Sequence, residues 1–284
     1  MYHILIIFIM QCSWVLPLFG QYTYTYEYGG FVEDAEVYVF LDQAMVYYTP
    51  SIDGKAIDQL PLLHPVVIIE ELESGEIIED HLQNWCHVSY EKDDKTRTGY
   101  VLEGSLSMVA LSFFEDGMET PLWFIWSITG FGEDQFWQSQ AKIIHGQEVI
   151  SEVDFDPIYT ETLPDEGYDY SIDAQIKDGS VLADNLTFFI IQYLYEACGY
   201  LNGSIYLTWN GEDLNYGFET SDVSEAGLFS VWTEVVFPED EGGEPGMIKV
   251  TEFQEEFREE VEEYVIMNKE TTVYRWDGKR LVVE

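Results

Sequence analysis

The chain has 284 residues, with 54 Asp and Glu against 12 Lys and Arg, so its formal net charge at neutral pH is −42. Binding to nucleic acid or to anionic membrane surfaces needs Lys and Arg to neutralise phosphates, so this composition argues against both functions. Hydrophobic residues make up 46% of the chain and aromatic residues 16%, which excludes the low-hydrophobicity pattern of intrinsic disorder.

Residues 1–20 differ from the rest of the chain because they contain no acidic and no basic side chain. An apolar run over 4–10 is followed by a second one over 15–19, and neither is long enough to span a membrane. The pattern predicts a secretory signal cleaved after Gly20, with an uncleaved N-terminal anchor as the alternative. We therefore expect a secreted or periplasmic protein with no membrane insertion after signal cleavage.

Short apolar or alternating runs, bounded by Gly, Pro, Asn and Asp, recur through the rest of the chain and predict a mainly β fold. The expected strands lie in Glu36–Leu41, Pro65–Ile69, Trp85–Tyr90, Thr98–Leu102, Ser105–Leu111, Leu122–Ile128, Ala141–Ile144, Leu186–Tyr195, Ser204–Trp209, Leu228–Phe237, Met247–Val250 and Thr271–Trp276. Asn210-Gly211 predicts a hairpin, and Asp277-Gly278 predicts another with a two-residue turn.

Helix is expected in few places. Phe253, Phe257 and Val261 recur every four residues, which predicts a helix over Thr251–Tyr264, with an acidic loop as the alternative. A shorter helix is predicted around Asp134–Gln140. Two acidic segments, Asp154–Ser171 and Pro238–Gly246, are predicted to be loops.

Cys86 and Cys198 are the cysteines that remain after the predicted cleavage. They could form one disulfide in an oxidising compartment, but two buried free thiols are the favoured prediction. His81, Cys86 and His87 invite a zinc interpretation. Adjacent residues of a strand point to opposite faces, however, so Cys86 and His87 are not expected to share a metal. No metal and no cofactor is predicted.

Several segments between residues 35 and 110 follow the order and spacing of a bacterial SH3 domain. Residues 45–51 occupy the position of its opening strand, and residues 57–60 and 66–70 occupy its middle strands. Trp85-Cys86-His87-Val88 and Gly99-Tyr100-Val101 occupy its last two strands. The region therefore resembles this family, which implies a small barrel that binds peptides or cell-wall material.

The predicted organisation is a signal over 1–20, an N-terminal segment over 21–34, an SH3-like barrel over 35–114 and an antiparallel β domain over 119–284. The last part resembles uncharacterised β-rich domains of secreted bacterial proteins that end in a Tyr-x-Trp-Asp-Gly-Lys hairpin, here Tyr274–Lys279. This resemblance implies no activity.

The predicted function is non-catalytic binding of a peptide, cell-wall or protein ligand that is neutral or cationic. The candidate ligand-binding residues are Tyr47, Tyr48, Trp85 and Tyr100, of which Trp85 is the one most expected to be core. No catalytic residue is predicted. Cys198 cannot act as a cysteine-peptidase nucleophile in the expected way, because no His follows it to serve as the base.

The alternative is a hydrolase that acts on cell-wall or glycan substrates through two carboxylates. With 54 acidic residues many pairs arise by chance, so the sequence identifies no particular pair.

Overall fold

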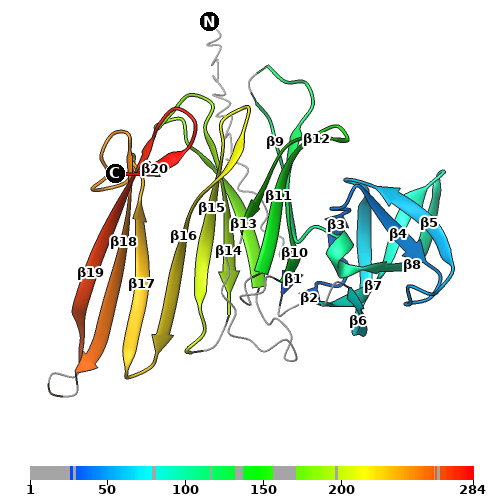
Figure 1. Cartoon of the computed structure of the whole chain (residues 1–284), viewed down its shortest axis with the longest axis horizontal. Helices are drawn as coiled ribbons and strands as arrows, with labels where there is room; N and C mark the ends of the chain where they lie inside the picture. Colours follow the sequence, from blue (N-terminus) through cyan, green and yellow to red (C-terminus); the bar gives the residue numbers. More distant parts are fainter. Residues whose placement is uncertain are drawn as a thin grey trace, which may run out of the picture.

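The computed structural model describes residues 26–27, 30–78, 81–115, 117–131, 137–155, 171–195, 198–258, 260 and 263–284 (Figure 1). These residues form twenty strands and one 3₁₀ turn, η1 (Glu103–Ser105), and none of them is α-helical. The predicted mainly β, antiparallel fold is therefore confirmed. The predicted signal over 1–20 lies outside the described residues, as does the central part of the acidic segment predicted over Asp154–Ser171.

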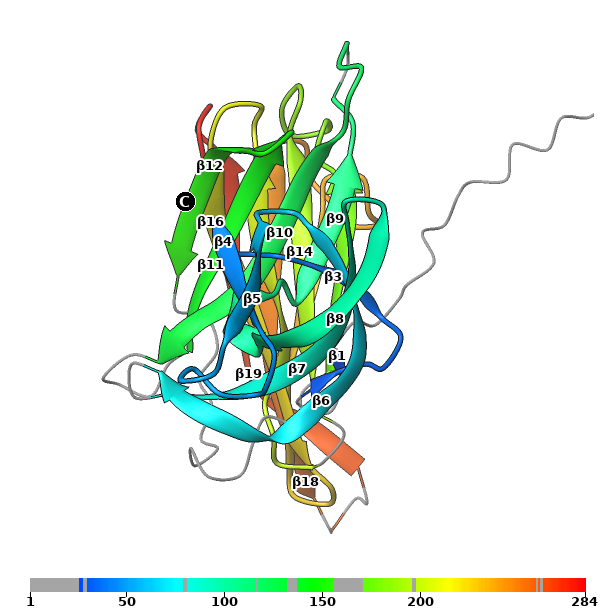
Figure 2. The same ribbon diagram turned by 90° about the vertical axis from the view of Figure 1, so that its right-hand side faces the viewer.

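The first sheet has six strands in the order β3-β6-β7-β8-β4-β5 and curls into a half-barrel (Figure 2). Its strands are β3 (Glu36–Tyr38), β4 (Gln43–Tyr47), β5 (Ala56–Pro61), β6 (Pro65–Ile78), β7 (His81–Lys92) and β8 (Lys95–Leu102). We call it the curled sheet. Register shifts between Ile68 and Glu70 and between Glu71 and Gly75 interrupt the long β6–β7 pairing, and such bulges bend a strand and increase its twist.

The second sheet has four strands in the order β12-β11-β10-β9. Its strands are β9 (Val109–Phe113), β10 (Leu122–Phe131), β11 (Trp137–His145) and β12 (Glu148–Phe155). All three pairings are antiparallel. Hydrogen bonding thus assigns β9 to this sheet, although the SH3-like barrel was predicted to run to residue 114.

The third sheet has ten strands in the order β2-β1-β13-β14-β15-β16-β17-β18-β19-β20. The strands are β1 (Tyr26–Glu27), β2 (Gly30–Phe31), β13 (Ser171–Asp178), β14 (Thr187–Leu194), β15 (Asn202–Trp209), β16 (Leu214–Glu225), β17 (Phe229–Val236), β18 (Met247–Arg258), β19 (Glu263–Trp276) and β20 (Leu281–Val283). Both predicted hairpins are confirmed, since β15 pairs with β16 and β19 pairs with β20. The second turn has four residues, 277–280, rather than the predicted two.

The ten-stranded sheet folds back on itself. The rings of Phe218 on β16 and Tyr274 on β19 stack with centroids 4.8 Å apart, although two strands separate β16 from β19 in the sheet order. Phe237, Ile248 and Leu281 from the C-terminal part pack in the same buried cluster as Phe188 and Tyr206, so β14–β16 have apolar packing against both of their faces.

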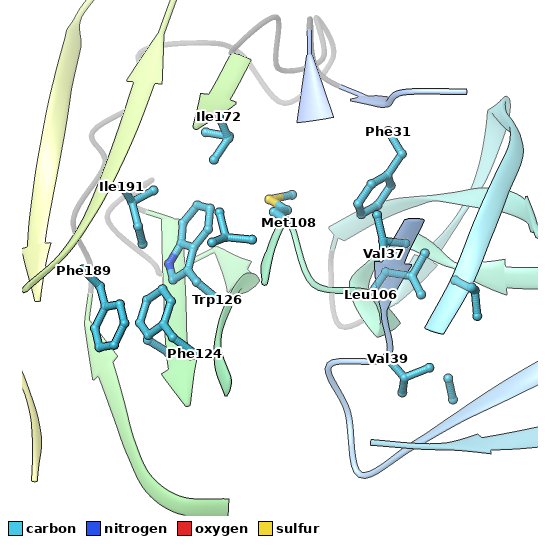
Figure 3. Close-up of a cluster of buried hydrophobic side chains, with 14 of the residues drawn as sticks. Phe31, Val37, Val39, Leu106, Met108, Phe124, Trp126, Ile172, Phe189 and Ile191 are labelled. Carbon is cyan, nitrogen blue, oxygen red and sulfur yellow. The ribbon is translucent and has the colours of Figure 1, made fainter. Parts of the chain in front are cut away.

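A single hydrophobic core joins all three sheets (Figure 3). Phe124 on β10 stacks on Phe189 on β14 with centroids 4.0 Å apart, which closes the four-stranded sheet onto the ten-stranded one. Met108 lies between this group and Leu106, which packs with the core of the curled sheet. The backbone N–H of Met108 donates to the carbonyl of Trp126. The curled sheet is therefore attached to the other two sheets through a buried contact region around Met108, which we call the seam.

The opposite face of the four-stranded sheet is covered by loops of the curled sheet. Phe40 and Leu62 pack there against Ile125 and Ile144. The buried Lys142 of β11 donates to the carbonyl of Phe40 at 3.1 Å and lies over its ring. Burial lowers the pKa of Lys142, while the negative charges of acidic neighbours such as Asp42 oppose that shift.

Besides the length of the second turn, three sequence-based predictions are wrong. Thr251–Arg258 belongs to β18 and Tyr264 belongs to β19, so these described residues of the predicted helix lie in two strands. A spacing of four residues is even, so it also places Phe253 and Phe257 on one face of a strand. Residues 137–140 of the second predicted helix lie in β11, and residues 134–136 lie outside the described part.

The third error concerns one cysteine. Cys86 and Cys198 are both free thiols and Cys86 is buried, as predicted, but Cys198 is exposed. It lies in a turn between β14 and β15, not within a strand. Among the described residues, no helix has the length and apolar character needed to cross a membrane.

Candidate binding site on the curled sheet

Three of the four predicted ligand-binding residues meet on neighbouring strands of the curled sheet. Tyr47 ends β4, Tyr100 lies on β8 and Trp85 lies on β7, and the order β7-β8-β4 makes these strands neighbours. Tyr47 is the register partner of Tyr100. The ring of Tyr47 meets the ring of Trp85 edge-on, with centroids 5.4 Å apart.

A fourth strand extends this arrangement. His87 on β7 is the register partner of Tyr100, and Glu70 on β6 is the register partner of His87. Glu70, His87, Tyr100 and Tyr47 therefore form a line across four strands, which we call the aromatic row. Because side chains alternate along a strand, the row lies on the face opposite the buried Val46, Val88 and Val101.

Within the row, His87 contacts the residues on both of its sides. His87 stacks on Tyr100 with centroids 4.7 Å apart and ring planes 20° apart. Nδ1 of His87 lies 3.4 Å from Oε1 of Glu70, which itself is exposed. A carboxylate, an imidazole and two phenol rings thus form one surface, with apolar faces and polar edges that a ligand can contact.

Trp85 is core rather than surface, as the sequence led us to expect. Its side chain is 1% exposed, beneath the edge of the Tyr47 ring. Tyr48 is 71% exposed and follows the last residue of β4, where its N–H donates to the carbonyl of Lys55. Among the described residues the structure records no ring contact for Tyr48, so this tyrosine lies beside the row rather than in it.

Charges on the curled sheet are arranged around Asp58. Its carboxylate pairs with Lys92 and with Arg97, which lies 2.8 Å away, and Tyr90 donates to it. Burial favours a raised pKa for Asp58, but the hydrogen bonds from Lys92 and the Gln59 N–H and the nearby cations bring that pKa below its ordinary range. These pairs neutralise two cations of the sheet, while Glu70 stays exposed in the row.

The thiol next to the row faces the other way. Cys86 precedes His87 on β7 but lies in the core, which confirms that adjacent residues of this strand take opposite faces. Burial, with added effects from the charges of Glu71 and Glu103, raises the pKa of Cys86 well above its ordinary value. Cys86 is therefore held as a neutral thiol, which is a poor nucleophile and a poor metal ligand.

Burial raises the pKa of several carboxyl groups, among them Glu219 and Glu103. Glu219 on β16 accepts hydrogen bonds from Tyr193 at 2.7 Å and Tyr216 at 3.5 Å, and burial raises its pKa to about 7 despite those bonds. Burial and the charge of Glu71 raise the pKa of Glu103. Glu71 accepts from the Phe31 N–H and the Asn84 amide, so it ties β2 to the curled sheet.

The sequence-based prediction includes both tyrosines of the aromatic row but neither Glu70 nor His87. The sequence suggests His87 only as a possible metal ligand, and Glu70 only as the end of a middle strand of the resembling domain. Their alignment depends on the register shift between Ile68 and Glu70, because one residue more or less would turn Glu70 to the core face. Because every second residue of a strand shares a face, His87 is expected on the same face as Trp85 and Ser89, which is the face of the aromatic row.

No protein-family model, curated protein or solved structure matches the chain.

Proposed function

We propose that this chain is a secreted, non-catalytic binding protein, and that its SH3-like curled sheet binds a neutral or cationic peptide, cell-wall or protein ligand. The observation that carries the proposal is the aromatic row. Glu70, His87, Tyr100 and Tyr47 are aligned in register on the sheet face that points away from the core, and His87 contacts both Glu70 and Tyr100. The resemblance to bacterial SH3 domains agrees with this assignment.

The chemistry of the row favours a ligand with basic or neutral polar groups. Phenol rings attract ammonium and guanidinium groups through their faces, and Glu70 supplies a carboxylate at one end of the row. The net charge of −42 attracts cationic ligands over a longer range and repels anionic ones. An anionic wall polymer is therefore a poorer ligand than a basic peptide.

The rigidity of the row supports binding rather than chemistry. Its rings pack on one another and on the buried Trp85, so little side-chain freedom is lost when a ligand binds. Its thiol neighbour Cys86 is turned into the core.

A binding titration tests the proposal. Three probes are a lysine-rich peptide, a neutral proline-rich peptide and soluble peptidoglycan fragments, each titrated calorimetrically into the protein. We expect the lysine-rich or the neutral probe to bind, and Tyr100→Ala to weaken that binding about tenfold, as for an aromatic anchor. Tyr47→Ala combined with Tyr48→Ala should also weaken it.

The matched control is Tyr200→Ala, which removes an exposed tyrosine stacked on Tyr195 far from the row in the chain. It should leave the affinity unchanged. Thermal melting of each variant separates binding from folding, because an equal loss of stability and affinity would show that Tyr47 and Tyr100 are packing residues. The absence of binding to all three probes would reject this ligand class.

The second candidate function is the carboxylate-based hydrolase acting on cell-wall or glycan substrates. Glu219 favours it, because a carboxyl whose pKa is about 7 can donate a proton at neutral pH. Turnover of peptidoglycan or of common glycans above the blank, abolished by Glu219→Gln, would replace the binding proposal with this one.

A further inference from the structure

The outer edge of β19 carries no strand over most of its length. On one side β19 pairs with β18 from Glu263 to Arg275. On the other side β20 pairs only with Tyr274, Arg275 and Trp276, and the Glu284 N–H donates to the carbonyl of Val273. From Glu263 to Thr272, no strand within the described part of the chain covers this edge, which lies at one end of the molecule (Figure 1).

Four consecutive apolar residues of this edge are exposed. The exposed fractions are 42% for Tyr264, 40% for Val265, 52% for Ile266 and 49% for Met267. A register shift in the β18–β19 pairing leaves Met267 without a register partner, and Tyr264 contacts the ring of Phe257 and accepts from the Gly227 N–H, so the side chains of this segment are partly exposed. Proteins usually shield such an edge with proline, charge or a covering loop, and an open one pairs readily with another strand.

The backbone direction of the edge follows from the last residues of the ladder. The carbonyl of Val273 points outward, since it accepts from Glu284. Outward-pointing residues alternate in an antiparallel strand, so the N–H and C=O groups of Thr271 and Lys269 point outward too. The side-chain oxygens of Thr251 and Thr271 lie 3.0 Å apart, which fits the closer pairs of a ladder that exchange no backbone hydrogen bonds.

Acidic residues surround this edge. The segments of β18 and β19 that form the open part carry the carboxylates Glu252, Glu255, Glu256, Glu263 and Glu270. Their two cations are already engaged, because Arg258 pairs with Glu256 at 2.9 Å and Lys269 lies over the ring of Phe253. An incoming strand with basic side chains would complement these charges, whereas a second copy of a chain with a net charge of −42 would be repelled.

We propose that the outer edge of β19, from Glu263 to Thr272, binds an extended cationic segment of a partner protein by β-strand addition. Backbone hydrogen bonds to outward groups such as those of Thr271 supply affinity. The exposed apolar side chains at Tyr264–Met267 and the surrounding glutamates select a segment in which apolar and basic residues alternate. This site is separate from the aromatic row and does not depend on its function.

The test uses the full chain and a capped peptide of alternating lysine and valine about eight residues long, a normal strand length. Thr271→Pro removes one outward N–H, a position where an edge strand tolerates proline. Thr271→Ala is the matched control, because it loses the same hydroxyl but keeps the N–H. We expect Thr271→Pro to weaken peptide binding about tenfold and Thr271→Ala to change it less than about twofold.

A second probe separates strand addition from simple charge attraction. The same peptide with alternate backbone nitrogens methylated keeps its charge and side chains but loses the hydrogen-bond donors of one edge. It should bind about tenfold more weakly than the unmethylated peptide. Equal binding of the two peptides, unchanged binding to Thr271→Pro, or no binding of the unmethylated peptide would each overturn the proposal.

Folding is checked by comparing the melting temperatures of the two variants. If Thr271→Pro fails to fold, the methylated peptide on the unaltered protein decides the question alone. Light scattering supplies a further outcome. Self-association that Thr271→Pro abolishes would also overturn the proposal, because the occupant of the edge would then be a second copy of the chain.

Discussion

The curled sheet and the β17–β19 part of the ten-stranded sheet both present aromatic side chains at the surface. They differ in their backbones, because the strands under the rings of the curled sheet are paired, whereas β19 has an unpaired edge. In the curled sheet the half-buried rings of Tyr47 and Tyr100 lie on paired strands above a buried core. In β19 the exposed Tyr264 and its neighbours lie on a bare edge. The first arrangement presents side chains on a fixed support, whereas the second presents hydrogen-bonding groups of the backbone itself. The two regions therefore suit different modes of recognition.

The largest effect on stability should come from the buried core that supports the curled sheet and is absent at the β19 edge. Phe189 is fully buried and stacks on Phe124, so Phe189→Ala leaves a cavity between the four-stranded and the ten-stranded sheets. We expect a loss of about 3–5 kcal/mol in the free energy of unfolding, measured by urea denaturation. Fluorescence and circular dichroism should report one coincident transition. Separate transitions would show that the continuous core does not couple the sheets.

A smaller, pH-dependent effect should come from Glu219 on the central β16. Burial raises its pKa to about 7 in the folded chain from an ordinary value of 4.5, so the folded state holds the proton more tightly. The stability contributed by Glu219 is complete below pH 4.5 and is lost as the pH rises through 7. Glu219→Gln should therefore gain stability relative to the parent over this window, by at most about 3 kcal/mol.

Urea denaturation at several pH values between 4 and 8 measures this difference. Glu234→Gln, which removes an exposed carboxylate on β17, corrects for the loss of one surface charge. For each variant, the change in the free energy of unfolding relative to the parent is plotted against pH. If the two changes keep a constant separation at every pH, the raised pKa of Glu219 in the folded chain is contradicted.

The smallest effect should come from the open β19 edge. Ile266 is half exposed, so Ile266→Ala removes few contacts, and the expected change in the free energy of unfolding is below about 0.5 kcal/mol. The same urea titration as for Phe189→Ala measures it. A loss comparable to that of Phe189→Ala would show that the edge is part of a packed core, and that the comparison of the two regions is wrong.

The sequence was sufficient for the fold class because alternation and turn residues act locally. It was misleading for Thr251–Tyr264, since Phe253 and Phe257 satisfy the periodicity of a helix and of a strand equally. The like-charged pair Glu255 and Glu259 was a local sign against a helix. Here β18 pairs antiparallel with both β17 and β19, the strands that precede and follow it in the chain.

Only part of the candidate site could be predicted, because local sequence patterns do not determine the register between strands. Tyr47 and Tyr100 lie in segments whose order suggested a barrel, so their proximity could be expected. The place of Glu70 in the aromatic row depends on a register shift in β6. The buried attachment of the curled sheet depends on Phe31 and Met108, which lie outside its strands. Register and long-range packing follow from the whole chain and leave little trace in a local pattern.

His87 offers the most direct measurement of the proposed function, because the chain has only five histidines and one of them lies in the aromatic row. Proton NMR of the imidazole resonances, with His87→Asn to assign the His87 signal, follows the row while the lysine-rich or the neutral peptide is added. We predict that the His87 resonance shifts in a saturable way, while that of His145, whose Nε2 lies 2.8 Å from the Thr120 hydroxyl, does not. Saturable binding of either peptide that leaves His87 unmoved would contradict the assignment of the aromatic row as the binding surface.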